Sequence, residues 1–233
     1  MLLLLSDFSM REIALDTETT GLSVENGDRI TEIGCVEIVN KRVTGKFFHV
    51  YVNPEREVSR EAQEISGLTY EFLKSHKKFN EVYTEFLDFI KDSRLIIHNA
   101  IFDIGFLNFE LEKSRAEIIK MENVINTLTM AKQKFPGSPA TLDALCKRFS
   151  IDASKRIKHG ALIDAELLAE VYINMSVRIQ QKDIFSIQRY TLNPISRIEK
   201  NLELKVIKVS ESELNAHNNL LKKIKEPIWT RFQ

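Results

Sequence analysis

The order of strand and helix patterns is the feature that most constrains how this chain can fold. Three strand-like segments come first, at residues 11–17, 30–39 and 46–52, and the stretch 40–45 suits a turn between the second and the third. Strands this close in sequence pair side by side in antiparallel order, because short turns join them. We therefore predict a three-stranded antiparallel meander at the start of the fold.

Helices and short strands alternate in the next part of the chain. Phe79, Val82, Phe86 and Ile90 recur at helical spacing, which predicts a helix over residues 79–90. The later patterns are, in order, a strand at 95–97, a helix at 101–113, a strand near Val124 and helices at 128–135, 142–149 and 160–175. A meander followed by such alternation predicts an α/β fold with a mixed five-stranded sheet flanked by helices. The ribonuclease H-like arrangement has this order, and other α/β folds also fit it.

The regular pattern fades after residue 176. We predict a main domain over residues 1–176, a linker over 177–200 and a partner-binding tail over 201–233. The tail has a strand pattern at 202–209 and then a capping box, Ser210 with Glu213, before a short apolar helix. So short a helix cannot bury its own apolar stripe, so it needs a partner surface.

Charge and length limit the partners. The 33 basic and 33 acidic residues cancel, which excludes a global positive field that holds long nucleic acids. Any grip on DNA must be local or come from a partner. The apolar run from Leu2 to Leu5 is too short for a signal peptide or a membrane span, so we expect a cytoplasmic protein that does not bind membranes. We also hypothesise that Met10 can serve as the start.

Two acids stand close together at the end of the first predicted strand. Asp16 and Glu18 are two residues apart, and the period of a strand places both side chains on one face. Like charges this close repel each other unless a cation lies between them. The alternative is a solvated strand end before the turn at Gly21.

A third acid, Asp103, opens a helix and has apolar neighbours such as Phe102 and Ile104. A carboxylate in this setting is costly without a charged partner. The alternative is a helix-capping role, but Asn99 suits that role better.

The fourth acid follows a histidine in the segment 159–164. If both residues were inside a helix, five positions would turn their side chains about 140° apart. We therefore expect His159 on the loop before the helix, Gly160 at the bend and Asp164 one turn inside. Polar surface is the alternative for His159.

Together, four acids and one histidine at strand ends and helix starts suit two hard divalent cations, which prefer oxygen ligands. Two such ions about 4 Å apart can hold a phosphodiester between them. A histidine titrates near neutral pH and can take a proton from water.

These clusters resemble the three exonuclease motifs of the DEDDh family in the ribonuclease H-like superfamily. Asp16 and Glu18 match the first motif, Asp103 the second, and His159 with Asp164 the third. The resemblance implies a 3′→5′ exonuclease in which the four acids bind two Mg²⁺ or Mn²⁺ ions and His159 is the general base.

Segments 142–146, 151–152, 154–156 and 159–162 are most similar to the epsilon (proofreading) subunits of bacterial DNA polymerase III. This resemblance implies that the substrate is the single-stranded 3′ end of DNA, cut to 5′-mononucleotides. The residues that it implies for substrate binding are Asp16, Glu18, Glu61, Ser66 and Asp164. Ser66 departs from the pattern, because the family has a histidine there.

The resemblance also implies protein partners. They are the polymerase catalytic (alpha) subunit, bound through the C-terminal tail, a small theta-like subunit and the sliding clamp. The residues that resemble a clamp-binding pentapeptide are Gln181, Asp183, Ile184 and Phe185. An ordinary linker with one exposed phenylalanine is the alternative.

Two other functions stay open from the sequence. One is a DEDDh exonuclease that acts on RNA or short oligonucleotides, and the other is a mainly structural subunit that stabilises a polymerase. The basic residues Lys155, Arg156 and Lys158 are candidate phosphate contacts, with a solvated loop as the alternative. Phe102 either packs against the terminal base or supports Asp103.

Overall fold

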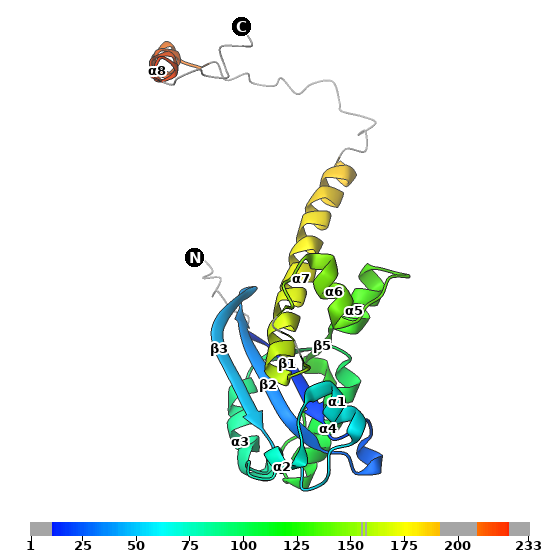
Figure 1. Cartoon of the computed structure of the whole chain (residues 1–233). Helices are drawn as coiled ribbons and strands as arrows, with labels where there is room; N and C mark the ends of the chain where they lie inside the picture. Colours follow the sequence, from blue (N-terminus) through cyan, green and yellow to red (C-terminus); the bar gives the residue numbers. More distant parts are fainter. Residues whose placement is uncertain (1–10, 155, 157, 192–208, 224–233) are drawn as a thin grey trace. The chain divides into compact units, whose positions relative to one another are not determined.

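A five-stranded mixed sheet forms the centre of the fold (Figure 1). The computed structural model describes residues 11–154, 156, 158–191 and 209–223. The strands are β1 (Arg11–Thr19), β2 (Ile30–Val39), β3 (Arg42–Tyr51), β4 (Arg94–Ile97) and β5 (Val124–Asn126), in the order β3-β2-β1-β4-β5. β1, β2 and β3 pair antiparallel, whereas β4 pairs parallel with β1 and β5 parallel with β4. The predicted meander and mixed sheet are confirmed.

The described helices are α1 (Arg60–Ser66), α2 (Tyr70–Leu73), α3 (Phe79–Ile90), α4 (Ala100–Lys113), α5 (Thr127–Lys134), α6 (Leu142–Phe149), α7 (Ala161–Thr191) and α8 (Glu211–Leu221), with 3-10 turns η1 (Val24–Asn26) and η2 (Met121–Asn123). The predicted bounds of α3 and α6 agree with the structure. The helices α1 and α2 are additional to those predicted. Within the described residues, we find no helix of the length and apolar character that crossing a membrane requires.

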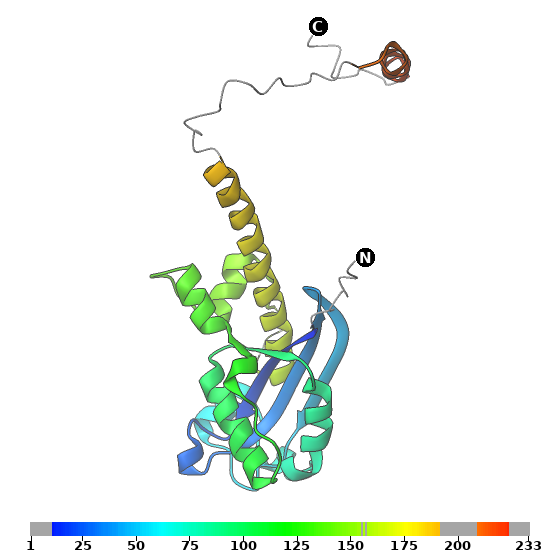
Figure 2. The ribbon, with the colours of Figure 1, turned by 180° about the vertical axis from the view of Figure 1, so that it is seen from behind.

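Helices cover both faces of the sheet. On one face, Ile13 and Leu15 of β1 pack with Phe86 of α3 and Phe106 of α4; this face is turned toward the viewer in Figure 2. On the other face, α6 and α7 pack against the sheet. Leu168 of α7 belongs to the buried cluster that these two helices form with the side chains on this face of the strands. Strands buried on both sides explain the apolar runs of the sequence.

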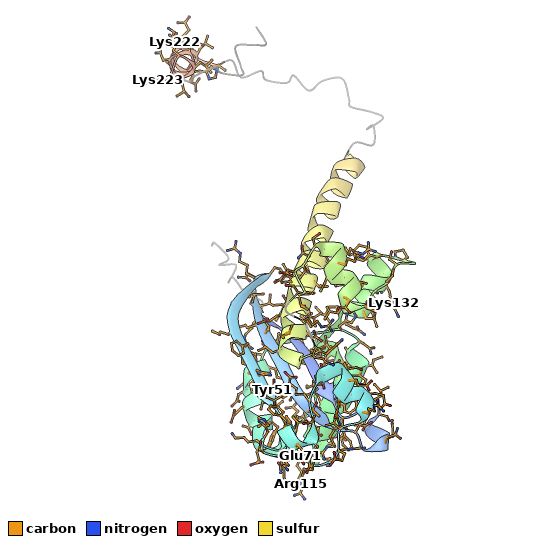
Figure 3. All side chains as sticks on the ribbon, viewed as in Figure 1. Tyr51, Glu71, Arg115, Lys132, Lys222 and Lys223 are labelled. Carbon is orange, nitrogen blue, oxygen red and sulfur yellow. The ribbon has the colours of Figure 1, made fainter. Side chains whose placement is uncertain are left out.

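The region around α1 and α2 has a small core of its own, formed by Val58, Leu68 and Leu73. Tyr51, at the end of β3, joins it to the sheet (Figure 3). Its ring lies edge-on to Phe72 of α2, with 5.0 Å between the centroids. These contacts fix the position of α1 beside the end of the sheet.

Helix α7 is longer than the sequence pattern predicts. We expected the helix to end near residue 175, but it continues to Thr191, so that expectation was wrong. Residues 176–191 contain no glycine or proline, so no residue there breaks the backbone pattern. The first part of the predicted linker is therefore helical. The chain divides into two compact units, Met1–Ser186 and Ile187–Gln233, and the predicted domain boundaries stay predictions.

The tail contains one described helix. Ser210 and Glu213 form the predicted capping box at the start of α8, which confirms that prediction. Around α8 the side chains of Val209, Leu214 and Leu220 are exposed. Figure 3 shows this helix with Lys222 and Lys223 at its end. The predicted strand at 202–209, except for Val209, and the hypothesis about Met10 fall outside the described residues.

Candidate active site

Three elements bring the four acids into one pocket. Asp16 and Glu18 lie at the end of β1, Asp103 in the first turn of α4 and Asp164 in the first turn of α7. All four line a pocket of about 390 Å³, and His159 lines it too. β1 and β4 run parallel, so the end of β4 delivers α4 beside the acids of β1.

Asp103 is held in place by one neighbour on β1. It is 3% exposed, and its Oδ1 accepts hydrogen bonds from Thr17 N (3.1 Å) and Thr17 Oγ1 (2.8 Å). Asn99 precedes α4 with a left-handed backbone, φ 64°, and its side chain makes no capping hydrogen bond. The capping role that we preferred for Asn99 is therefore wrong for its side chain.

His159 and Asp164 have the predicted arrangement. α7 begins at Ala161, and the Asp164 amide donates to the Gly160 carbonyl at 2.9 Å, so the histidine lies on the loop before the helix. His159 Nδ1 is 3.3 Å from Asp164 Oδ2, and the histidine side chain is 46% exposed. One ligand atom each from Glu18, His159 and Asp164 lie within 4.8 Å of one another.

The histidine loop is tied to α1. The His159 amide donates to the Ile65 carbonyl at 3.2 Å. The Lys158 ammonium donates to the Glu64 carbonyl. The backbone next to the candidate base is therefore fixed by the helix that carries Glu61.

The start of α7 lies against the backbone of β2. A Cβ atom at Gly34 would be 2.2 Å from the Ala161 carbonyl carbon and 2.3 Å from Leu162 N. Only glycine permits this approach, which sets the depth of Asp164 and His159 relative to the sheet.

Burial and mutual repulsion disfavour ionisation of these acids. Burial, followed by the charges of Asp103, Asp164 and Glu18, raises the pKa of Asp16 well above its ordinary value, while Arg156 opposes this. Burial, Glu32 and Asp164 raise the pKa of Glu18 to about 8. Burial raises the pKa of Asp103 to about 7, although the hydrogen bonds from Thr17 lower it.

The donor set fits hard divalent cations. It offers carboxylate oxygens from three elements, and the described residues that line the pocket include no cysteine. Asp164 Oδ1 is buried without a hydrogen-bond partner, although Arg156 Nε makes an ion-pair contact with it. The two groups attract each other by charge, but the N–H is not aligned for a hydrogen bond. A bound cation would relieve the repulsion that the raised pKa values record.

Two charged neighbours of the acids, Arg156 and Glu32, were missed in the sequence analysis. Arg156 pairs with Asp164 inside the pocket, whereas we expected it to contact phosphate or to lie on a solvated loop. Glu32 is buried opposite Glu18 on β2 and bonds to His49 Nε2 at 2.7 Å. An acid inside an apolar strand was the signal that could have identified Glu32.

The predicted substrate contacts on α1 lie apart from the pocket lining. Glu61 is exposed in the first turn of α1. Ser66 is buried, and its hydroxyl donates to the Ala62 carbonyl at 2.9 Å and accepts from the Leu68 amide at 3.2 Å. Phe102 lines the pocket, and its ring also packs against Phe106 in a tilted arrangement, with 4.9 Å between the centroids. The roles of all three in substrate binding stay predictions.

The residues that resemble a clamp-binding pentapeptide have helical backbone. Gln181, Asp183, Ile184 and Phe185 lie within α7, and their side chains are outside the described part of the chain. Clamp binding therefore stays a prediction.

Comparisons with known proteins agree with this geometry. A family model described as "Exonuclease" matches residues 13–172. The chain is 47% identical to the DNA polymerase III subunit epsilon of Rickettsia conorii, over 93% of this chain and 97% of that protein. It is 43% identical to the subunit of the same name from Escherichia coli (strain K12), over 89% and 90%.

Solved structures share the fold. The nuclease domain of 3′hExo, a DEDDh family member bound to rAMP, has a TM-score of 0.63 at 20% identity, covering 74% of this chain and 94% of that one. Exonuclease X in complex with 5′ overhanging duplex DNA has a TM-score of 0.55 at 24% identity, covering 71% and 90%. These likenesses show that the chain shares the fold of these two proteins.

Proposed function

We propose the roles of individual residues from one premise: the chain belongs to the exonuclease family, and within it to the DNA polymerase III epsilon subunits. Its function is that of a 3′→5′ proofreading exonuclease, and the family depends on divalent metal ions. The observation that carries our assignment is the convergence of Asp16, Glu18, Asp103 and Asp164 with His159 in one pocket.

The four acids hold two divalent cations, Mg²⁺ or Mn²⁺, in this proposal. Asp103 is positioned for this role by Thr17, which donates two hydrogen bonds to one of its oxygens. When bound, the ions supply Lewis acidity that activates a water molecule and stabilises the leaving oxygen of the phosphodiester. The identity and number of the ions are part of the proposal.

His159 is the general base. It lies at the mouth of the pocket, half exposed, where a water molecule can approach it. Its Nδ1 faces Asp164 and Arg156, so Nε2 is the atom directed away from these contacts. The imidazole takes the proton from the attacking water as the terminal phosphodiester is hydrolysed, and a 5′-mononucleotide leaves.

The substrate is the unpaired 3′ end of a DNA strand. A frayed end can enter a pocket that a paired end cannot, so a mispaired primer terminus supplies much of the selectivity. Glu61 and Ser66 are the residues of α1 that we assign to the terminal nucleotide by resemblance, and Lys158 remains a candidate phosphate contact.

The partners are those of a replication complex. The exposed apolar residues around α8, Val209, Leu214 and Leu220, support binding of the tail to the polymerase alpha subunit. A theta-like subunit and a clamp contact through Gln181 to Phe185 belong to the same proposal, as does a cytoplasmic location.

The test uses the full chain with a 5′-labelled DNA single strand and Mn²⁺. We expect stepwise shortening from the 3′ end, slower cleavage of RNA of the same sequence, and no cleavage by an Asp103→Asn variant. Faster cleavage of RNA would favour the rival RNA exonuclease, and an inactive wild type would favour a structural subunit. A control variant, Arg29→Gln, breaks an ion pair with Glu110, and neither residue lines the pocket.

A further inference from the structure

We propose that Arg156 is a built-in counter-cation of the active site: its guanidinium neutralises Asp164 in the metal-free protein and gives up that carboxylate when a divalent cation binds. The inference rests on the proposed metal site. Arg156 thus positions Asp164 and competes with the metal ion for its carboxylate, in addition to any contact with phosphate.

The contacts of Arg156 cover both oxygens of Asp164. Arg156 Nη2 donates to Asp164 Oδ2 at 2.7 Å, and Arg156 Nε makes an ion pair with Asp164 Oδ1. The Arg156 side chain is 8% exposed and the Asp164 side chain 4% exposed. A divalent cation needs those same carboxylate oxygens, so the guanidinium and the ion cannot both hold them fully.

The negative charges of the pocket explain why the Arg156 guanidinium is present there. Among the described residues that line the pocket, Arg156 is the one arginine or lysine. It lowers the pKa of Asp16 and of Glu18 against the larger effects that raise them. Once a doubly charged ion has entered, the neighbouring guanidinium repels it.

The hold of Arg156 on Asp164 is suited to being exchanged. Arg156 Nε and Asp164 Oδ1 are buried yet make no hydrogen bond of acceptable geometry. Arg156 Nη1 also pairs with Asp143 Oδ1, and the Asp143 side chain is 70% exposed. The guanidinium thus has a second partner at the rim of the pocket that it can keep after it leaves Asp164.

The same guanidinium contacts the candidate base. Arg156 Nη2 is 2.8 Å from His159 Nδ1. As a donor without acceptor capacity, it favours the His159 tautomer whose Nδ1 accepts and whose Nε2 carries the hydrogen, so Nε2 cannot take a proton from water while this contact is in place. Release of Arg156 by the metal would therefore also free the ring of His159, so that metal binding and the position of the base are coupled.

A purely structural ion pair is the competing explanation. In that case, loss of Arg156 would disorder the loop that carries His159 and would weaken metal binding or leave it unchanged. A counter-cation predicts the opposite sign, because its removal takes away a competitor for Asp164.

The test is Mn²⁺ binding to the full chain without DNA, measured by calorimetry at fixed pH. We expect Arg156→Gln to bind Mn²⁺ about tenfold more tightly than the wild type, and Arg156→Lys to show a smaller gain. The matched control, Arg29→Gln, loses a buried ion pair away from the pocket and should leave Mn²⁺ affinity unchanged.

Unchanged or weaker Mn²⁺ binding by Arg156→Gln, together with wild-type binding that Asp103→Asn abolishes, would overturn this inference alone. Wild-type protein that binds no Mn²⁺ would overturn the proposed metal site as well. If Arg156→Gln does not fold, the NMR resonances of the arginine Nε–H groups in the wild type are followed during a Mg²⁺ titration instead. The inference requires the Arg156 resonance to shift and fails if it does not.

Discussion

Glu18 is surrounded by other acids, and its ionisation should therefore depend on the metal. Glu32 lies opposite it on β2, and Asp164 approaches from α7. Together with burial, these charges raise the pKa of Glu18 from an ordinary 4.5 to about 8. Between these two pH values, Glu18 is therefore protonated in the folded metal-free protein and ionised in the unfolded chain.

The sign of the pH dependence follows from this difference. The free energy of unfolding is highest below the pKa that Glu18 has in the unfolded chain. It falls as the pH rises through the pKa that Glu18 has in the folded protein, because the buried carboxylate is then ionised. We expect Glu18→Gln to raise the melting temperature of chelator-treated protein more at about pH 8.5 than at about pH 5. An equal or larger gain at the lower pH would contradict the raised pKa. Saturating Mn²⁺ should flatten the pH slope of the wild type.

A substitution of His159 separates metal binding from catalysis. At saturating metal we expect His159→Gln to lose about 100-fold to 10,000-fold in rate, the usual size of general-base catalysis. Its Mn²⁺ affinity should change little, because the four carboxylates remain. Single-turnover kinetics and calorimetry measure the two quantities. Full activity, or a fall in metal affinity as large as the fall in rate, would rule out the assigned role.

The acids that we assign as ligands could be selected from the sequence, whereas the contacts that their neighbours make could not. Asp16, Glu18 and Asp103 stand at strand ends and helix starts, where local patterns place them. The ion pair of Arg156 with Asp164 depends on how a loop folds back over α7, and the position of Glu32 depends on strand register. Neither property is encoded in a short stretch of sequence.

At the scale of elements, the packing of α7 on β2 positions Asp164 and His159. The close approach at Gly34 leaves no room for a methyl group. We expect Gly34→Ala to cost about 1–3 kcal/mol or more in the free energy of unfolding and to lower exonuclease activity, because α7 must shift. Urea denaturation and a DNA degradation assay measure both effects.

Gly105 provides the matched control. It lies within α4 close to Asp103, and a Cβ there would meet nothing within 4 Å. Gly105→Ala should be neutral or stabilise the helix by up to about 1 kcal/mol. A Gly34→Ala variant as stable and as active as Gly105→Ala would show that the approach of α7 to β2 is not needed.

Element prediction succeeded where a helix has a clear apolar face. Both α3 and α6 bury regularly spaced residues, and their bounds were predicted correctly. The helices α1 and α2 were not predicted, because they are short and depend on the small core around Leu73. The end of α7 was misplaced because the change in composition after residue 176 was taken for a linker.

At the scale of the whole molecule, the tail should recruit partners rather than take part in hydrolysis. We expect Leu214→Asp with Leu220→Asp, in the full chain, to abolish co-purification with the polymerase alpha subunit while cleavage of single-stranded DNA continues. Both leucines are more than half exposed on α8. The control is Asn218→Asp, which adds a charge on the same helix. Undiminished co-purification of the double variant would mean that the polymerase contact lies elsewhere.

The central claim is that acids from distant parts of the chain bind a pair of divalent cations beside His159. Anomalous diffraction from crystals grown with Mn²⁺ tests it most directly. The account predicts two peaks about 4 Å apart, in contact with carboxylate oxygens of Asp16, Glu18, Asp103 and Asp164. No peak in this pocket, or Mn²⁺ bound only at other surfaces, would contradict it.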